Sequence, residues 1–167
     1  MKQWSGWKSV WGIAITLMAA EIVLFGLYHT PAVVWLGYCG WIVLWCAAFF
    51  GVVPVFMFRQ KGGVAEGTSY INTTVLVDSG LYAILRHPQY LSFIMICLGI
   101  VLVAQTALVV VIGVPAMLLF YIAIRQQDHF LTEKFGDEYT QYMKKVPSIN
   151  ILLGIIRVLH RRVKSNQ

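Results

Sequence analysis

Two polar segments carry the residue types from which a reaction site could be built. The first, residues 79–90, contains Arg86 and His87 and leads directly into a long apolar run. The second, residues 127–142, contains Asp128 and follows the last apolar run. Histidine and aspartate serve as general bases, and arginine orients anionic groups through charge-assisted hydrogen bonds. Together these segments predict polar chemistry held at a membrane surface.

Each segment also has an ordinary structural explanation. Pro88 is favoured at the first turn of a helix, Arg86 can anchor a span at headgroup depth, and Tyr90 fits the aromatic belt of a membrane. His87 can be a packed or capping histidine, and a polar helix after a last span is often only a solvated tail. Either segment alone leaves the structural and functional interpretations open.

The composition places the chain in a bilayer. Of its 167 residues, 59% are hydrophobic and 12% are charged, with a mean hydropathy of +0.71. This is more apolar surface than a soluble domain can bury. Because a transmembrane helix needs roughly 17–25 mostly apolar residues, we expect an all-α integral membrane protein with about four transmembrane helices and C-terminal amphipathic cytoplasmic helices. The expected spans are residues 10–28, 33–58, 91–104 and 107–124, the last two forming a tight hairpin.

The basic residues predict the orientation of these spans. All 13 Lys and Arg residues fall in segments on one side, while the two other connections, 29–32 and 105–106, contain none. Cytoplasmic loops are rich in Lys and Arg, so we expect both termini in the cytoplasm. The net charge of +6 is spread over several loops without a nucleic-acid-binding motif. It therefore predicts contact with anionic lipid and no nucleic-acid partner.

We expect one domain, because the chain is short and has no internal repeat. It would comprise an N-terminal helical pair (1–58), a cytoplasmic loop (59–90), a helical hairpin with the second polar motif (91–147) and an interfacial tail (148–167). The polar stretch after residue 124 keeps helical spacing, with Tyr139 and Tyr142 on the apolar face of an amphipathic helix, and Gly136 predicts a break in it. The three cysteines are scattered and lack metal-ligand spacing, so we predict neither a metal site nor disulfides.

Glu21 is an ionisable residue inside the first predicted span. Such a residue is costly in a bilayer and indicates a function or a partner on another helix. It either hydrogen-bonds across helices or stays protonated.

The motifs resemble a known family when they are considered together. Gly80-Leu-Tyr82, then Arg86-His87-Pro88-x-Tyr90, a hydrophobic hairpin, an acidic region, Phe-Gly-x-Glu-Tyr-x-x-Tyr and Val-Pro follow one another in this order. This set resembles the isoprenylcysteine carboxyl methyltransferase and phospholipid methyltransferase superfamily, over roughly residues 73–147. The resemblance implies transfer of a methyl group from S-adenosyl-L-methionine to a lipophilic acceptor that enters from the bilayer. No Gly-x-Gly-x-x-Gly follows a strand, which argues against a soluble nucleotide-binding fold.

The resemblance also implies site residues. Two candidates would orient a carboxylate acceptor, and two would act as a base for an amine or thiol acceptor. The candidate catalytic residues are Arg86 and Arg125 for the first role, and His87 and Asp128 for the second. The implied cofactor-binding residues are Thr74, Val75, Leu76, Val77, Tyr82, His87, Pro88, Gln89, Tyr90 and Gln127.

Two positions depart from the family's pattern. The family usually has two adjacent acids where this chain has Gln127-Asp128, and prenylcysteine enzymes tend to carry an arginine where it has Ala123. Because Gln127 is uncharged, the cofactor would bind more weakly or in a different arrangement. Arg125 or Arg86 would have to orient a carboxylate, or the acceptor is not a carboxylate.

The leading hypothesis is thus an S-adenosyl-L-methionine-dependent membrane methyltransferase with O-methylation like that of isoprenylcysteine carboxyl methyltransferases. A phospholipid amine or a small thiol is the alternative acceptor. Two other classes of protein stay open. One is an NADPH-dependent membrane reductase, since steroid reductases share the general look of a polar motif around a terminal helical hairpin. The other is a non-enzymatic membrane scaffold that lost the cofactor through Gln127.

Overall fold

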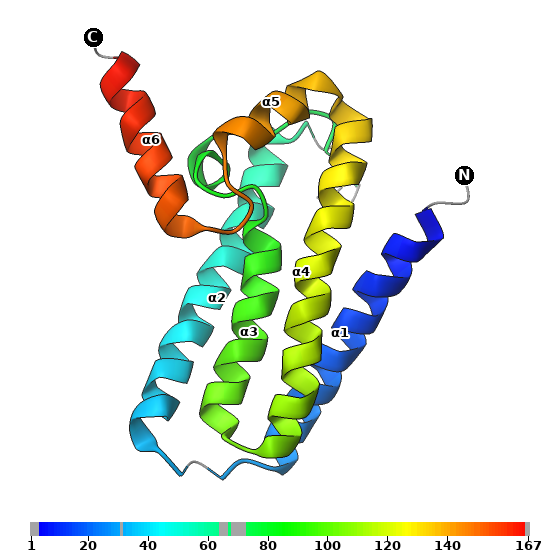
Figure 1. Cartoon of the computed structure of the whole chain (residues 1–167), viewed down its shortest axis with the longest axis vertical. Coiled ribbons are helices and arrows are strands. Elements are labelled where there is room, and N and C mark those ends of the chain that lie inside the picture. The colour runs from blue at the N-terminus through cyan, green and yellow to red at the C-terminus, as the bar shows by residue number, and fades with distance from the viewer. Residues whose placement is uncertain (1–3, 31, 64–66, 68–72, 166–167) are drawn as a thin grey trace. The chain divides into compact units, whose positions relative to one another are not determined.

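The computed structural model describes residues 4–30, 32–63, 67 and 73–165. Within these residues the chain is helical and contains no strand (Figure 1). The elements are α1 (Trp4–Leu27), α2 (Val34–Lys61), the 3₁₀ helix η1 (Gly80–Ala83), α3 (Pro88–Ala104), α4 (Ala107–Phe135), α5 (Asp137–Lys145) and α6 (Ile151–Ser165).

Three of these helices are long and apolar enough to cross a membrane. The segments that meet this condition are Ser9–Leu27, Val34–Lys61 and Ala107–Phe135, and α3 is a shorter apolar helix of 17 residues. The expectation of an all-α protein with about four transmembrane helices is confirmed. The protein is a multi-pass integral membrane protein.

The helices around the polar segments are longer than the apolar pattern predicted. α2 continues to Lys61, because the first helix breakers after it are Gly62 and Gly63. α3 begins at Pro88, since proline is well suited to the first turn of a helix. α4 does not end with its apolar stretch at Ile124 but continues to Phe135.

Contacts divide the chain into two compact units, each built from two separate stretches. The first unit comprises Met1–Phe49 and Tyr90–Gln127, and the second comprises Phe50–Gln89 and Asp128–Gln167. Helices α2, α3 and α4 therefore contribute residues to both units. The single domain expected from the sequence stays a prediction.

Small and polar residues hold the helices of the first unit together. α2 and α3 approach closely at Gly40 and Gly99, where a Cβ on Gly40 would lie 2.9 Å from the Gly99 carbonyl oxygen. Ser92 on α3 donates a hydrogen bond to the Ala47 carbonyl on α2 at 2.7 Å. Small residues at helix contacts let backbones pack closely in a membrane.

The predicted hairpin of α3 and α4 is present in the first unit, and its turn is tight (Figure 1). Gln105 in the turn has a positive φ of 53°. Its side-chain amide donates to the Val33 carbonyl at 2.8 Å and accepts from the Val33 amide at 2.7 Å. This residue therefore ties the α3–α4 turn to the start of α2.

Glu21 on α1 is fully buried inside the first unit. Its carboxyl lies against Gly113 of α4, where an added Cβ would collide with Oε1. The carboxyl interacts with the thiol of Cys97, but neither oxygen has a hydrogen-bond partner of good geometry among the described residues. An ionisable side chain in a span is expected to face the protein interior in this way.

The second unit contains the polar end of α4 together with α5 and α6. α5 begins after Gly136, whose φ of 58° suits glycine, so the break predicted there is present. Tyr139 and Tyr142 of α5 pack with Val146 into a small core. Residues 73–77, which look extended in the sequence, form no regular element.

Candidate functional site

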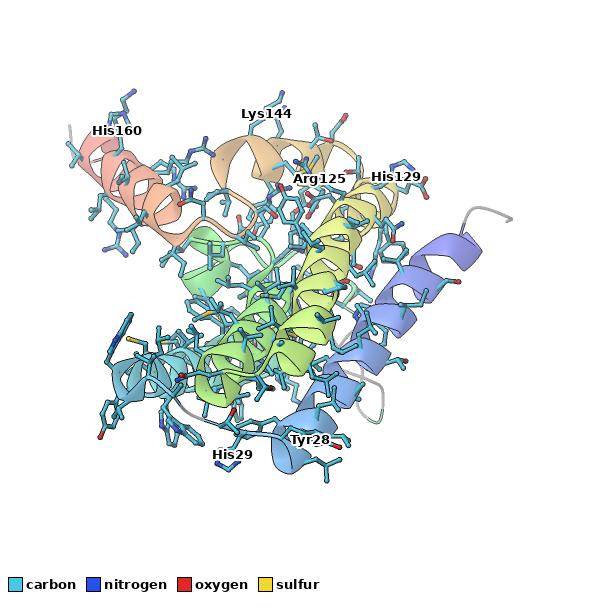
Figure 2. The ribbon with its side chains drawn as sticks, turned by 60° about the horizontal axis from the view of Figure 1, so that its bottom comes forward. Tyr28, His29, Arg125, His129, Lys144 and His160 are labelled. Atoms are coloured by element: carbon cyan, nitrogen blue, oxygen red, sulfur yellow. The ribbon has the colours of Figure 1, made fainter. Side chains whose placement is uncertain are left out.

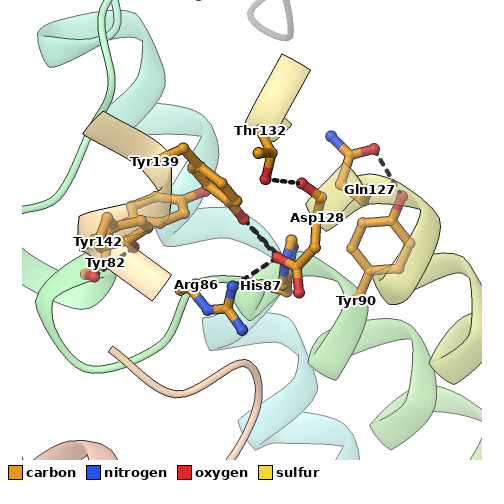
Figure 3. A network of polar contacts seen from close by, with 9 residues as sticks. All are labelled: Tyr82, Arg86, His87, Tyr90, Gln127, Asp128, Thr132, Tyr139 and Tyr142. Atoms are coloured by element: carbon orange, nitrogen blue, oxygen red, sulfur yellow. Dashed lines mark hydrogen bonds and ion pairs between the residues drawn. The ribbon is translucent and has the colours of Figure 1, made fainter. Parts of the chain in front are cut away.

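The two polar segments meet at one carboxylate oxygen in the second unit (Figure 3). Oδ1 of Asp128 accepts a hydrogen bond from Nη1 of Arg86 at 2.8 Å and from the hydroxyl of Tyr139 at 2.6 Å. Nε2 of His87 lies 2.7 Å from the same oxygen. We call Arg86, His87, Asp128 and Tyr139 the Asp128 cluster.

Local structure explains how Arg86 and His87 reach this position. They precede Pro88, which starts α3, and the residue before a proline disfavours helical backbone, so the helix does not continue back over them. Their backbone amides donate to the carbonyl oxygens of Pro147 at 3.0 Å and Ser148 at 3.1 Å. The chain after α5 therefore fixes the backbone from which the two side chains project.

Tyr139 is a permanent hydrogen-bond donor in this cluster. Burial, followed by the hydrogen bond to Asp128 and the negative charge of that residue, raises the pKa of the Tyr139 phenol well above its ordinary value. The phenol therefore stays protonated and donates to the carboxylate at physiological pH.

Tyr142 supports the neighbouring segment from the same helix. Its hydroxyl donates to the Tyr82 carbonyl at 2.6 Å, and burial raises the pKa of this phenol as well. The Tyr82 ring stacks on Phe58 with ring centroids 4.9 Å apart. Within the second unit, Tyr142 therefore holds the backbone of Tyr82, and Phe58 packs against its ring.

The Asp128 cluster keeps unused hydrogen-bonding capacity. The side chains of Arg86 and Asp128 are 10% and 14% exposed. All side-chain hydrogen bonds of Asp128 to described residues use Oδ1, and Arg86 uses only Nη1. Nε of Arg86 is buried without a partner among those residues. The cluster can thus offer a carboxylate oxygen and guanidinium donors to a bound group.

A second polar contact lies in the first unit. The hydroxyl of Tyr90 on α3 is 3.4 Å from Oε1 of Gln127 on α4, which is long for a hydrogen bond (Figure 3). Both residues were predicted from the family resemblance to bind the cofactor. The structure brings them together, and their role stays a prediction.

The other predicted site residues lie in varied surroundings. Thr74 donates from its hydroxyl to the Gly63 carbonyl at 2.9 Å. Val75 is exposed, Val77 is buried, and Leu76 packs against the core around Tyr139. Gln89 is half-buried in the first turn of α3.

Arg125 is exposed on α4, and we find no partner for it among the described residues (Figure 2). The residue that occupies the family's arginine position, Ala123, is fully buried. Of the two arginines that could orient a carboxylate acceptor, only Arg86 belongs to the Asp128 cluster.

The sequence interpretation missed the hydrogen-bonding roles of Tyr139 and Tyr142. Both were assigned to the apolar face of an amphipathic helix. Their spacing of three residues on a short helix that follows Asp128 was the available signal, because such residues share a helix face.

Several curated proteins are similar to this chain. A protein-S-isoprenylcysteine O-methyltransferase of Schizosaccharomyces pombe is 36% identical over 75 residues, which cover 44% of this chain and 32% of that protein. Protein-S-isoprenylcysteine O-methyltransferase B of Arabidopsis thaliana is 32% identical over 116 residues, covering 62% and 59%. The cobalt-zinc-cadmium resistance protein CzcN of Cupriavidus metallidurans is 26% identical over 159 residues, covering 89% and 65%. The chain spans between about a third and two thirds of the length of these relatives.

No solved structure gives a significant match to the chain. The family model described as phospholipid methyltransferase matches residues 38–138. That range includes the whole first polar segment and the second polar segment as far as the start of α5. Because this match covers more than half of the residues of the chain, the chain belongs to the phospholipid methyltransferase family.

Proposed function

We propose that this protein is a membrane methyltransferase that uses S-adenosyl-L-methionine and methylates a lipophilic acceptor. Membership of the phospholipid methyltransferase family and the names of its isoprenylcysteine O-methyltransferase relatives support this proposal. The Asp128 cluster is the observation that carries it.

The chemistry of the Asp128 cluster fits the amino-acid end of S-adenosyl-L-methionine. That end carries an ammonium group and a carboxylate. The uncommitted Oδ2 of Asp128 can accept from the ammonium, and the remaining guanidinium nitrogens of Arg86 can donate to the carboxylate. His87 and Tyr139 would keep the Asp128 carboxylate oriented by holding its other oxygen. When bound, the cofactor would supply an electrophilic methyl group.

We propose carboxyl O-methylation of an isoprenylcysteine-like acceptor, with a phospholipid amine or a small thiol as the alternative. A carboxylate acceptor is already a nucleophile, so binding and positioning dominate its reaction. An amine or thiol has to lose a proton, and His87, held by Asp128, would be the candidate base.

The role of His87 separates these acceptors. If the acceptor is a carboxylate, we expect His87→Gln to leave the pH profile of kcat unchanged in shape. If it is an amine or thiol, the variant should remove the limb of the profile that reports the base. The measurement is methyl transfer to prenylcysteine, phospholipid and thiol acceptors in parallel.

The decisive experiment is S-adenosyl-L-methionine binding, measured by calorimetry on the full chain in lipid nanodiscs. We expect saturable binding to the parent and binding at least about tenfold weaker in Asp128→Asn, because a hydrogen bond between charged groups is lost. Asp137→Asn makes the same chemical change at an exposed position on α5 and should bind like the parent. Unfolding midpoints establish that both variants fold.

Other results would change the proposal. Equal binding by the parent and Asp128→Asn would show that the Asp128 cluster does not bind the cofactor. Binding of NADPH instead of S-adenosyl-L-methionine would make the protein a reductase. Binding of neither cofactor would indicate a scaffold.

We also propose that both termini face the cytoplasm. This rests on the 13 Lys and Arg residues, which all fall in segments on one side of the expected spans. A reporter domain that is active only in the cytoplasm should be active when it is fused to either end of the chain. A reporter that is active only outside the cytoplasm should be inactive at both ends.

A further inference from the structure

Helix α6 contacts the rest of the second unit through an unusual face. Gly154 is buried, and a Cβ there would collide with the carbonyl oxygen of Ile84. Nη2 of Arg161 donates to the Ala83 carbonyl at 2.9 Å, and Nη1 of Arg157 donates to the Lys144 carbonyl at 3.4 Å. A glycine and two arginines therefore make these contacts of α6 with the rest of the unit.

The apolar face of α6 points away from these contacts. Residues spaced by four, three and four positions share one side of a helix, and here they form an apolar stripe. The members of this stripe are between 56% and 75% exposed. The α6 stripe consists of Leu152, Ile156, Leu159 and Val163. A helix that packed as in a soluble protein would turn such a stripe inward.

The charges of α6 identify what covers the stripe. The helix contains no acidic residue, and Arg162 and Lys164 lie exposed in its last turn. His160 is also exposed (Figure 2). An apolar stripe beside cations matches a bilayer surface with anionic headgroups. The bilayer is within reach, because residues 136–150 alone separate α6 from the spanning helix α4.

The inner face of α6 is tied to the segment that bears the Asp128 cluster residues. Ala83 and Ile84, which Arg161 and Gly154 contact, lie just before Arg86 and His87. The amides of Arg86 and His87 bond to the carbonyls of residues 147 and 148, immediately before α6. α6 and the two residues bonded shortly before it thus hold residues 83–87 on one side, and α6 exposes its stripe on the other.

We propose that α6 docks its stripe into an anionic headgroup surface and thereby holds residues 83–87, with Arg86 and His87, in place. This inference goes beyond the proposed methyl transfer and does not depend on it.

Hydrogen–deuterium exchange on the full chain tests the docking. The protein is placed in nanodiscs of phosphatidylcholine alone, or with about a third phosphatidylglycerol. We expect amides of α6 and of residues 83–87 to exchange about fivefold more slowly in the anionic discs, the effect of roughly one basic residue near such a surface. Equal exchange in both lipids would overturn the docking.

Matched charge reversals test whether the effect belongs to α6. Arg162→Glu with Lys164→Glu should abolish the difference between the two lipids. Lys144→Glu with Lys145→Glu makes the same change in net charge on exposed residues of α5 and should retain it. Loss of the difference in both double variants, or in neither, would overturn the assignment to α6.

A third variant tests the connection between α6 and residues 83–87. Gly154→Ala pushes α6 off Ile84, so residues 83–87 should lose their response to lipid charge while α6 keeps its own. If Gly154→Ala does not fold, Arg161→Gln removes only the bond to Ala83 and should weaken the response in the same segment. An undiminished response of residues 83–87 would show that α6 docks without holding them.

Discussion

Nε2 of His87 lies 2.7 Å from Oδ1 of Asp128, although 41 positions separate the two residues in the chain. Between them run α3, the hairpin turn and most of α4. The same oxygen accepts hydrogen bonds from Arg86 and Tyr139. One carboxylate therefore joins the segment before α3 to the polar end of α4 and to α5. Replacing Asp128 should loosen the contacts among all three.

Tyr139→Phe should destabilise the protein. The change removes the 2.6 Å hydrogen bond to Asp128 and leaves the apolar packing of the ring intact. We expect the free energy of unfolding to fall by about 1–2 kcal/mol, the usual range for a bond to a charged group whose acceptor keeps other donors. The measurement is denaturant unfolding in detergent. Tyr121→Phe, on an exposed tyrosine of α4, is the control and should have no effect.

Stability should fall at high pH because of the two buried tyrosines of α5. Burial raises the pKa of Tyr139 and Tyr142, so the folded protein keeps protons that the unfolded chain releases near pH 10. The stabilisation is complete below about pH 10 and declines above it, by up to about 1.4 kcal/mol per pH unit and tyrosine. Unfolding free energies measured from pH 8 to pH 11 should show this decline, and Tyr142→Phe should make it shallower. A profile with the same slope in the variant would contradict the prediction.

Gly113→Ala should destabilise the first unit, because the added methyl group collides with the Glu21 carboxyl. We expect a loss of about 1–3 kcal/mol, typical of overpacking. Gly12→Ala is the control, since a Cβ there meets nothing within 4 Å.

Removing the Glu21 side chain should relieve the clash. The double variant Glu21→Ala with Gly113→Ala should therefore be more stable than the sum of the two single changes predicts. Simple additivity in denaturant unfolding would mean that the two residues are not coupled in the protein.

Gln127→Glu should strengthen binding of S-adenosyl-L-methionine if Gln127 makes the cofactor contact that the family resemblance implies. The new carboxylate would give Tyr90 a charged acceptor in place of the long 3.4 Å contact and would supply the missing negative charge. We expect about tenfold tighter binding by calorimetry, equivalent to one charge-assisted hydrogen bond. Gln141→Glu, at an exposed position on α5, is the matched control. Unchanged or weaker binding by Gln127→Glu would remove Gln127 from the candidate cofactor contacts.

The membrane architecture could be predicted from the sequence because it depends on composition and on local signals. Long apolar runs imply helices that span a bilayer. Pro88 and Gly136 mark a helix start and a break through their backbone preferences alone, and the structure places both there. The polar residues after Ile124 keep helical spacing and contain no breaker before Gly136, so the sequence also indicated the continuation of the helix that ends at Phe135.

The sequence by itself determined a helical membrane protein of a recognisable family, with reactive residue types in two separate polar segments. Only the tertiary structure decided that Arg86, His87 and Tyr139 meet at one oxygen of Asp128, and that Arg125 is exposed and not part of this cluster. It also decided that α6 turns Gly154 inward and its apolar stripe outward. The physical reason is that periodicity and propensity are local, whereas the partner of a side chain depends on how distant segments pack.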